Sequence, residues 1–123
     1  MIFNRNKIIE YARKNFCSEP EYLWAKSPNY FILKHKENKK WYAIVMDIPA
    51  SKLGLDDTKI IDVLNVKLDV EYEPEILNLL LGTKGFFPAY HMNKSKWISI
   101  ILDDSVKKSE IINLINTSYE ITK

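Results

Sequence analysis

The sequence has few of the residues from which most catalytic and metal sites are built. Its 123 residues include one cysteine, two histidines and three glycines. A single cysteine cannot form an internal disulfide, and it suits a reducing cytoplasm. Cys17, His35 and His91 match no metal-ligand spacing, and the glycines match neither nucleotide-binding loop motif. We therefore expect a protein without a metal, without another cofactor and without catalysis.

Long apolar runs are also missing. No stretch approaches the roughly 20 consecutive apolar residues of a membrane span. Residues 1–16 mix apolar and basic side chains, which is typical of a surface helix and not of a secretory signal. Hydrophobic residues still make up 46% of the chain, enough for a folded core. The length suits a single domain over residues 1–123. With a single cysteine and no membrane span, we expect a cytoplasmic protein without a membrane partner.

Neither sign of charge dominates, because the net charge is only +2. The distribution is uneven, however. Residues 1–40 carry nine Lys or Arg and four Glu, whereas residues 56–75 carry seven acids and two lysines. Residues 84–97 carry three lysines and no acid. If the two basic segments meet in the fold, they form a face that can orient a charged partner. The alternative is scattered, solvated charge.

Apolar spacing predicts helices and strands in a definite order. Apolar residues recur with helical spacing over residues 4–16, 74–81 and 107–119. Strands are expected over residues 30–33, 41–48, 64–70 and 97–102. Residues 64–70 alternate without exception, which predicts a strand with one buried and one solvent-exposed face. Residues 84–88 are expected to form a loop. Helices at both ends and strands between them predict an α+β fold, an antiparallel β-sheet with helices packed on one face.

Two polar clusters are candidates for binding nucleic acid. Lysines neutralise phosphates, aromatic rings stack on exposed bases, and Asn and His can hydrogen-bond to base edges. The first cluster is a basic hairpin tip and the second is a polar segment before the last strand. Their candidate residues are Lys34, His35, Lys36, Lys39, Lys40, Tyr90, His91, Asn93, Lys94, Lys96 and Trp97. Each cluster also has a structural interpretation. Charged hairpins protect sheet edges, and Asn93 suits a turn that Tyr90 and Trp97 anchor to the core.

Four stretches resemble the MmcQ/YjbR family of small bacterial proteins in order and spacing. They are Pro20–Trp24 with Pro28–Phe31, Lys34-His35 with Lys40–Ala43, Leu53–Leu55 with Asp62–Lys67, and Phe87–Lys94 with Trp97 and Ser118-Tyr119. The resemblance covers about residues 5–121, and Tyr90–Lys94 is its most specific part. Two positions depart from the family. Lys96 stands where the family usually has His, and Leu68-Asp69-Val70 stands where Cys-Asp-Pro is frequent. The first change removes a titratable ring, which weakens any proposal of acid–base chemistry.

The resemblance implies a sandwich fold similar to the CyaY-like and secretion-chaperone-like folds. It also implies a DNA-binding role through two β-hairpin wings. We therefore expect a non-enzymatic DNA-binding protein whose binding is weak and largely independent of sequence. The main alternative is a chaperone-like or adaptor-like module that binds another protein through an exposed sheet face. A weaker alternative is a small-ligand or enzyme site around Tyr90, His91 and Asn93. A single site would place Lys34 and His35 close to the segment 90–97.

Overall fold

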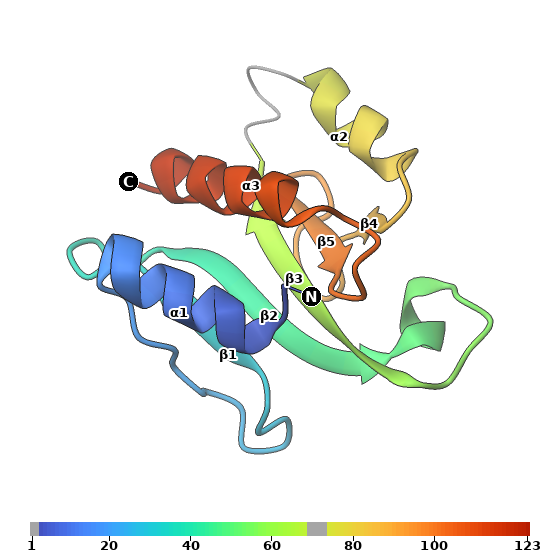
Figure 1. The fold of residues 1–123 in the computed structure, drawn as a ribbon, viewed down its shortest axis with the longest axis horizontal. Coiled ribbons are helices and arrows are strands. Elements are labelled where there is room, and N and C mark those ends of the chain that lie inside the picture. The colour runs from blue at the N-terminus through green and yellow to red at the C-terminus, as the bar shows by residue number, and fades with distance from the viewer. Residues whose placement is uncertain (1–2, 69–73) are drawn as a thin grey trace.

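The computed structural model describes residues 3–68 and 74–123 (Figure 1). Five antiparallel strands form one sheet in the order β1-β2-β3-β5-β4. The strands are β1 (Phe31–Lys34), β2 (Trp41–Pro49), β3 (Ile60–Lys67), β4 (Phe86–Pro88) and β5 (Trp97–Ile101), and the short 3-10 helix η1 (Ala50–Leu53) joins β2 to β3. Helices α1 (Arg5–Phe16) and α3 (Lys108–Ile121) lie side by side across one face, and α2 (Pro74–Leu81) packs beside β4. This arrangement confirms the expected α+β fold.

The face under α1 and α3 carries the larger apolar core. Asn4 caps α1 by accepting a hydrogen bond from the Lys7 backbone N–H at 3.1 Å, as its position before the apolar stripe suggests. Both helices present isoleucines to the sheet. The buried side chains include Ile8, Ile9 and Ala12 of α1, Ile111 and Ile115 of α3, and Phe31, Leu33, Val45, Leu64, Val66, Ile98 and Ile100 of the strands. The expected inward face of residues 98, 100 and 102 is therefore confirmed.

The opposite face, which α1, α2 and α3 leave uncovered, holds a second apolar cluster. Its buried members are Ile32, Ile44, Met46, Ile48 and Val63, and half-buried Trp24, Tyr30, Trp41, Tyr90, Met92 and Trp97 pack around them. The covering side chains come from the segments 21–30 and 89–96. Asn65 in the middle of β3 is consequently 0% exposed. The prediction of a solvent-exposed face on this strand is wrong for residues 64–66, and residues 69–70 lie outside the described part of the chain.

The structure adds a strand where the sequence predicted a loop. Phe86 pairs with Ile100 and Pro88 pairs with Ile98, so residues 86–88 form the edge strand β4. Proline cannot donate a ladder hydrogen bond, and an edge strand is where a sheet tolerates it. The central strand β3 also begins at Ile60 and not at Leu64. With β4 at the edge beside β5, residues 89–96 become the loop of a β-hairpin.

Candidate functional site

Two hairpin loops lie at the same end of the sheet. The first, residues 35–40, joins β1 to β2, and the second, residues 89–96, joins β4 to β5. Strands β2 and β5 both run antiparallel to β3, so both begin at the end of the sheet where β3 ends. The basic tip and the polar segment of the sequence therefore flank the end of β3.

At this end, lysine and tryptophan alternate across the uncovered face. Lys34 of β1 lies opposite Trp41 of β2, and Lys67 of β3 lies opposite Trp97 of β5. Both tryptophans belong to the apolar cluster of the uncovered face. The strands β1, β2, β3 and β5 are neighbours in that order, so the two pairs lie on adjacent pairs of strands, just beyond the last β2–β3 pair, Ala43 with Val66. We call these four residues the Lys–Trp row.

The row continues into further aromatic rings. The indole of Trp24 makes edge contacts with Trp41 at 5.9 Å and with Tyr30 at 5.8 Å between ring centroids. Burial raises the pKa of Tyr30, and the neighbouring Tyr90 hydroxyl raises it further. Tyr30 and Tyr90 both pack against the apolar cluster, so the segments 21–30 and 89–96 both cover this face.

A buried polar pair beneath Tyr90 fixes the second segment to the sheet. The Ser99 hydroxyl donates to the side-chain oxygen of Asn65, and the backbone N–H of Tyr90 donates to Ser99 Oγ at 3.0 Å. The Asn65 amide also donates to the Ile44 carbonyl at 3.4 Å. Neither Asn65 nor Ser99 is among the candidate residues predicted from the sequence. The only signal for them was polar residues in strands whose other positions are apolar.

His35 does not belong to this face. Its ring lies on the helix side, 6% exposed, with Nε2 2.8 Å from Thr122 Oγ1 and its centroid 4.1 Å from that of Tyr119. Burial lowers the pKa of His35. The prediction that His35 joins a single site with the segment 90–97 is wrong, because it points to the opposite side of the sheet. Lys34 lies on the same face as Trp97, and its ammonium pairs with Glu21 at 3.1 Å.

The remaining candidate residues lie on the two loops, exposed to solvent. They are Lys36, Lys39 and Lys40 on the first loop, and His91, Asn93, Lys94 and Lys96 on the second. Asn93 is partly occupied within its own turn, since its side-chain oxygen accepts from the Ser95 N–H at 3.0 Å and from the Ser95 hydroxyl at 2.6 Å. The turn role foreseen for Asn93 is confirmed, and less of its side chain is available to read a base edge.

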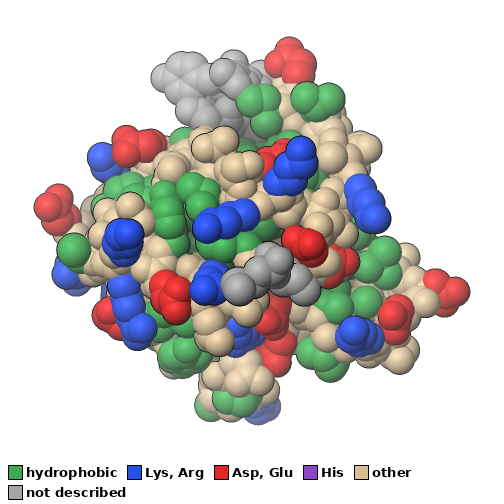
Figure 2. Space-filling view, in the orientation of Figure 1, with side chains coloured by type: hydrophobic (Ala, Val, Ile, Leu, Met, Phe, Trp, Pro, Cys, Tyr) green, Lys and Arg blue, Asp and Glu red, His purple; other side chains and the backbone are tan. Residues whose placement is uncertain are grey.

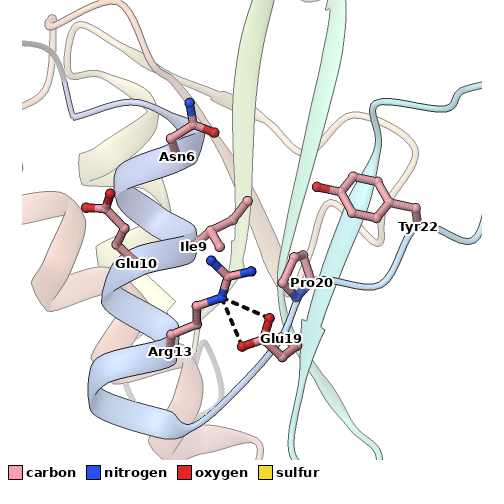
Figure 3. A pocket seen from close by; sticks show the side chains of 7 residues that line it. All are labelled: Asn6, Ile9, Glu10, Arg13, Glu19, Pro20 and Tyr22. Carbon is pink, nitrogen blue, oxygen red and sulfur yellow. Dashed lines mark hydrogen bonds and ion pairs between the residues drawn. The ribbon is translucent and has the colours of Figure 1, made fainter.

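The helix side offers a poorer surface for an anionic partner. Figure 2 shows Lys and Arg side chains interspersed with Asp and Glu over this side. A groove between α1 and the segment 19–22 is lined by Asn6, Ile9, Glu10, Arg13, Glu19, Pro20 and Tyr22 (Figure 3). Arg13 Nε crosses it to both oxygens of Glu19, at 2.8 and 2.9 Å. This ion pair ties the segment to α1, and with Glu10 the lining carries two acids against one base.

Two further properties concern metals and membranes. Among residues 3–68 and 74–123, no three His, Cys, Asp or Glu side chains come together as metal ligands. In the same ranges, no helix is long and apolar enough to cross a membrane.

Comparison with known proteins places the chain in a family. The family model described as YjbR matches residues 17–121. The chain belongs to the YjbR family. Protein YyaQ of Bacillus subtilis (strain 168) is 40% identical over 122 residues, 99% of this chain and 100% of YyaQ. The resemblance drawn from the sequence is therefore confirmed.

Solved structures agree with this YjbR fold. A crystal structure of a Pseudomonas syringae protein, 40% identical, matches with a TM-score of 0.91 over 98% of this chain and 99% of that one. A solution NMR structure from the same organism gives 0.83 at 40% identity, over 98% and 93% of the two chains. Deinococcus radiodurans protein DR2400 shares the fold alone, with a TM-score of 0.66 at 18% identity over 94% and 75%. Two of the four stretches that carried the YjbR resemblance, around residues 20–31 and 87–97, contribute side chains to the apolar cluster of the uncovered face.

Proposed function

We propose that this YjbR-family protein is a non-enzymatic, cytoplasmic DNA-binding protein that holds single strands on the uncovered face of its sheet. The observation that supports this most is the Lys–Trp row. Trp41 and Trp97 are half-buried, so each indole is held by the core and keeps part of its surface open to solvent. Bases stack on such rings while ammonium groups neutralise the adjoining phosphates.

The row favours unpaired over paired bases. A duplex hides the faces of its bases within its own stack, whereas a single strand offers them to aromatic side chains. The basic loops then serve as flanking cations: Lys36, Lys39 and Lys40 on one side and Lys94 on the other. Few groups are placed to read base edges, since the Asn93 oxygen is engaged in its turn. Binding should accordingly be weak and largely independent of sequence.

Fluorescence tests this proposal directly, because the tryptophans would report the contact. A short oligothymidine and a duplex of equal length are titrated into the protein at low salt, with tryptophan emission and the anisotropy of labelled DNA recorded together. We expect tighter binding of the single strand and quenching of tryptophan emission by stacked bases. Equal or tighter binding of the duplex would refute the stacking role of the row.

A charge reversal makes the test specific. Lys67→Glu places a carboxylate within the row, and we expect it to reduce single-strand affinity by about tenfold or more. Lys59→Glu makes the same change on an exposed residue just before β3, at the other end of the sheet, and should leave affinity nearly unchanged. Thermal unfolding of both variants checks that the fold is retained. Equal loss in the two variants would indicate non-specific attraction only.

One observation favours a protein partner as the second candidate. Tyr22 and Leu23 are adjacent, and 54% and 53% of their surfaces are exposed. Adjacent exposed apolar side chains can form part of a docking site. Tyr22 lines the groove beside α1, with its ring centroid 5.7 Å from that of Phe31. A partner would therefore dock at this edge of the sheet, because the centre of the uncovered face is already buried. Absence of oligonucleotide binding by the wild-type protein at low salt would favour this function over DNA binding.

A further inference from the structure

A separate cavity lies between η1 and the segment 87–94. It has a volume of about 410 Å³, within the range of sites that hold small ligands. Its lining residues are Lys52, Leu53, Phe87, Pro88, Ala89, Tyr90, His91 and Lys94. The walls are mostly apolar and the polar groups are few and basic, which is the usual composition of a small-ligand site. None of these residues belongs to the Lys–Trp row.

The charged side chains that line the cavity are both lysines, which favours an anionic ligand. Lys52 and Lys94 come from distant parts of the chain and converge on it, and no carboxylate lines it. None of the ion pairs among the described residues involves either lysine. The lining therefore contributes two positive charges and no negative one. Lysine is a common point-charge partner of phosphate.

His91 adds a hydrogen-bonding ring in a constrained position. Its backbone lies in the left-handed region, with φ of 57°, which few residues other than glycine adopt. The imidazole centroid is 3.9 Å from that of Tyr90, whose backbone N–H is held by Ser99. The turn holds a potential N–H donor and an aromatic ring side by side in the cavity lining.

We propose that this cavity binds a terminal phosphate monoester that a sugar joins to a planar base, as in a nucleoside monophosphate or the 5′-phosphorylated end of a DNA strand. A monoester carries a charge of about −1.5 to −2 at pH 7, so it matches two ammonium groups better than the single charge of a phosphodiester. The rings of Phe87 and Tyr90 supply surfaces for the planar group. The inference stands on the cavity lining, and it does not require that the Lys–Trp row bind a strand.

Amide NMR with the intact protein tests the site. Adenosine 5′-monophosphate, thymidine 5′-monophosphate, adenosine and inorganic phosphate are each titrated into labelled protein. We expect both monophosphates to shift the amides of Lys52 and of residues 89–94, and to bind about tenfold more tightly than adenosine or phosphate alone. No shift at these amides with either monophosphate would overturn the proposal. Phosphate binding as tightly as the monophosphates would overturn it too, because only an ion would then be recognised.

Matched variants separate this site from the rest of the surface charge. Lys52→Gln with Lys94→Gln should reduce monophosphate affinity by about tenfold or more. Lys59→Gln with Lys84→Gln removes the same charge from exposed residues outside the lining and should change it little. An equal loss in both pairs would overturn the assignment to the cavity.

Oligonucleotides distinguish the two sources of the ligand. Oligothymidines with a 5′-phosphate and with a 5′-hydroxyl are compared by competition. A preference of about fivefold or more for the phosphorylated strand, lost in the Lys52/Lys94 variant, assigns the cavity to strand ends. Monophosphate binding without such a preference assigns it to free nucleotides. Oligonucleotide binding without any monophosphate binding would refute the cavity proposal alone, whereas the reverse result would refute the strand-binding function alone.

Discussion

Ser99 and Asn65 face each other across β5 and β3, and the Ser99 hydroxyl donates to the Asn65 side-chain oxygen. Both residues are 0% exposed. The same Ser99 oxygen accepts the N–H of Tyr90. This pair is therefore the point at which the segment 89–96 is attached to the sheet, and the positions of Tyr90 and His91 depend on it.

Removing the Ser99 hydroxyl should destabilise the fold and loosen that segment. Ser99→Ala leaves the Tyr90 N–H and the Asn65 oxygen without this partner, and an unsatisfied buried polar group costs about 1–3 kcal/mol. We expect a loss of that size in the free energy of unfolding, measured by urea denaturation, and faster amide exchange at Tyr90 and His91. Ser109→Ala, on the exposed surface of α3, should change stability by less than about 0.5 kcal/mol. Equal stability of the two variants would contradict the attachment role.

The same pair shows how far sequence reasoning reaches. Strict alternation over residues 64–67 correctly predicted a strand and the inward direction of Leu64 and Val66. It could not predict that Asn65 is buried, because this depends on a serine 34 positions away and on a segment folded over the face. His35 was misplaced for a similar reason, since its partner Thr122 is 87 positions away. The local sequence shows whether a segment has helical or strand periodicity. Hydrogen bonds between residues far apart in the chain depend on tertiary packing, which the local sequence does not show.

The candidate site was predictable in part. The basic and aromatic residues of both loops were recognisable by type as candidates for binding, but how the two loops lie relative to each other depends on the strand order. Without β4, whose proline hides the strand pattern, the second loop is not recognisable as a hairpin beside β5. The Lys–Trp row was also missed, because Lys67 looked like an ordinary solvent-facing position of an alternating strand.

His35 should make the protein sensitive to acid. Burial lowers the pKa of His35 in the fold, while the unfolded chain has the ordinary value of about 6.5. Protonation therefore favours the unfolded chain. The contribution of neutral His35 is complete above about pH 6.5 and declines as the pH falls towards its folded pKa, by at most about 1.4 kcal/mol per pH unit. Urea denaturation at several pH values should show this decline in the wild type and a smaller one in His35→Gln. Parallel declines would exclude His35 as the cause.

Gly85 and Gly82 form a matched pair for a test of packing. Gly85 has φ of +94°, and a Cβ there would lie 2.5 Å from Val106 Cγ2 and 3.2 Å from Ser105 Cβ. Strain and overpacking together should make Gly85→Ala cost about 2–4 kcal/mol. A Cβ at Gly82 would meet only carbonyl oxygens of Leu79 and Asn78, at 3.6 and 3.8 Å, so Gly82→Ala should cost less than about 1 kcal/mol. Thermal or urea unfolding measures both, and similar costs would contradict the packing described around β4.

The salt dependence of DNA binding counts the lysines that reach phosphates. If Lys34, Lys40, Lys67 and Lys94 each neutralise one phosphate of a single strand, the logarithm of affinity should fall with the logarithm of salt at a slope of about −3. Lys40→Gln with Lys67→Gln removes two of these contacts, and the slope should shrink to about −1.5.

Anisotropy of labelled oligothymidine at several salt concentrations measures both slopes. Lys59→Gln with Lys107→Gln, which changes two exposed lysines outside the row, should leave the slope at its wild-type value. An unchanged slope in the Lys40/Lys67 variant would show that the strand does not lie along the Lys–Trp row.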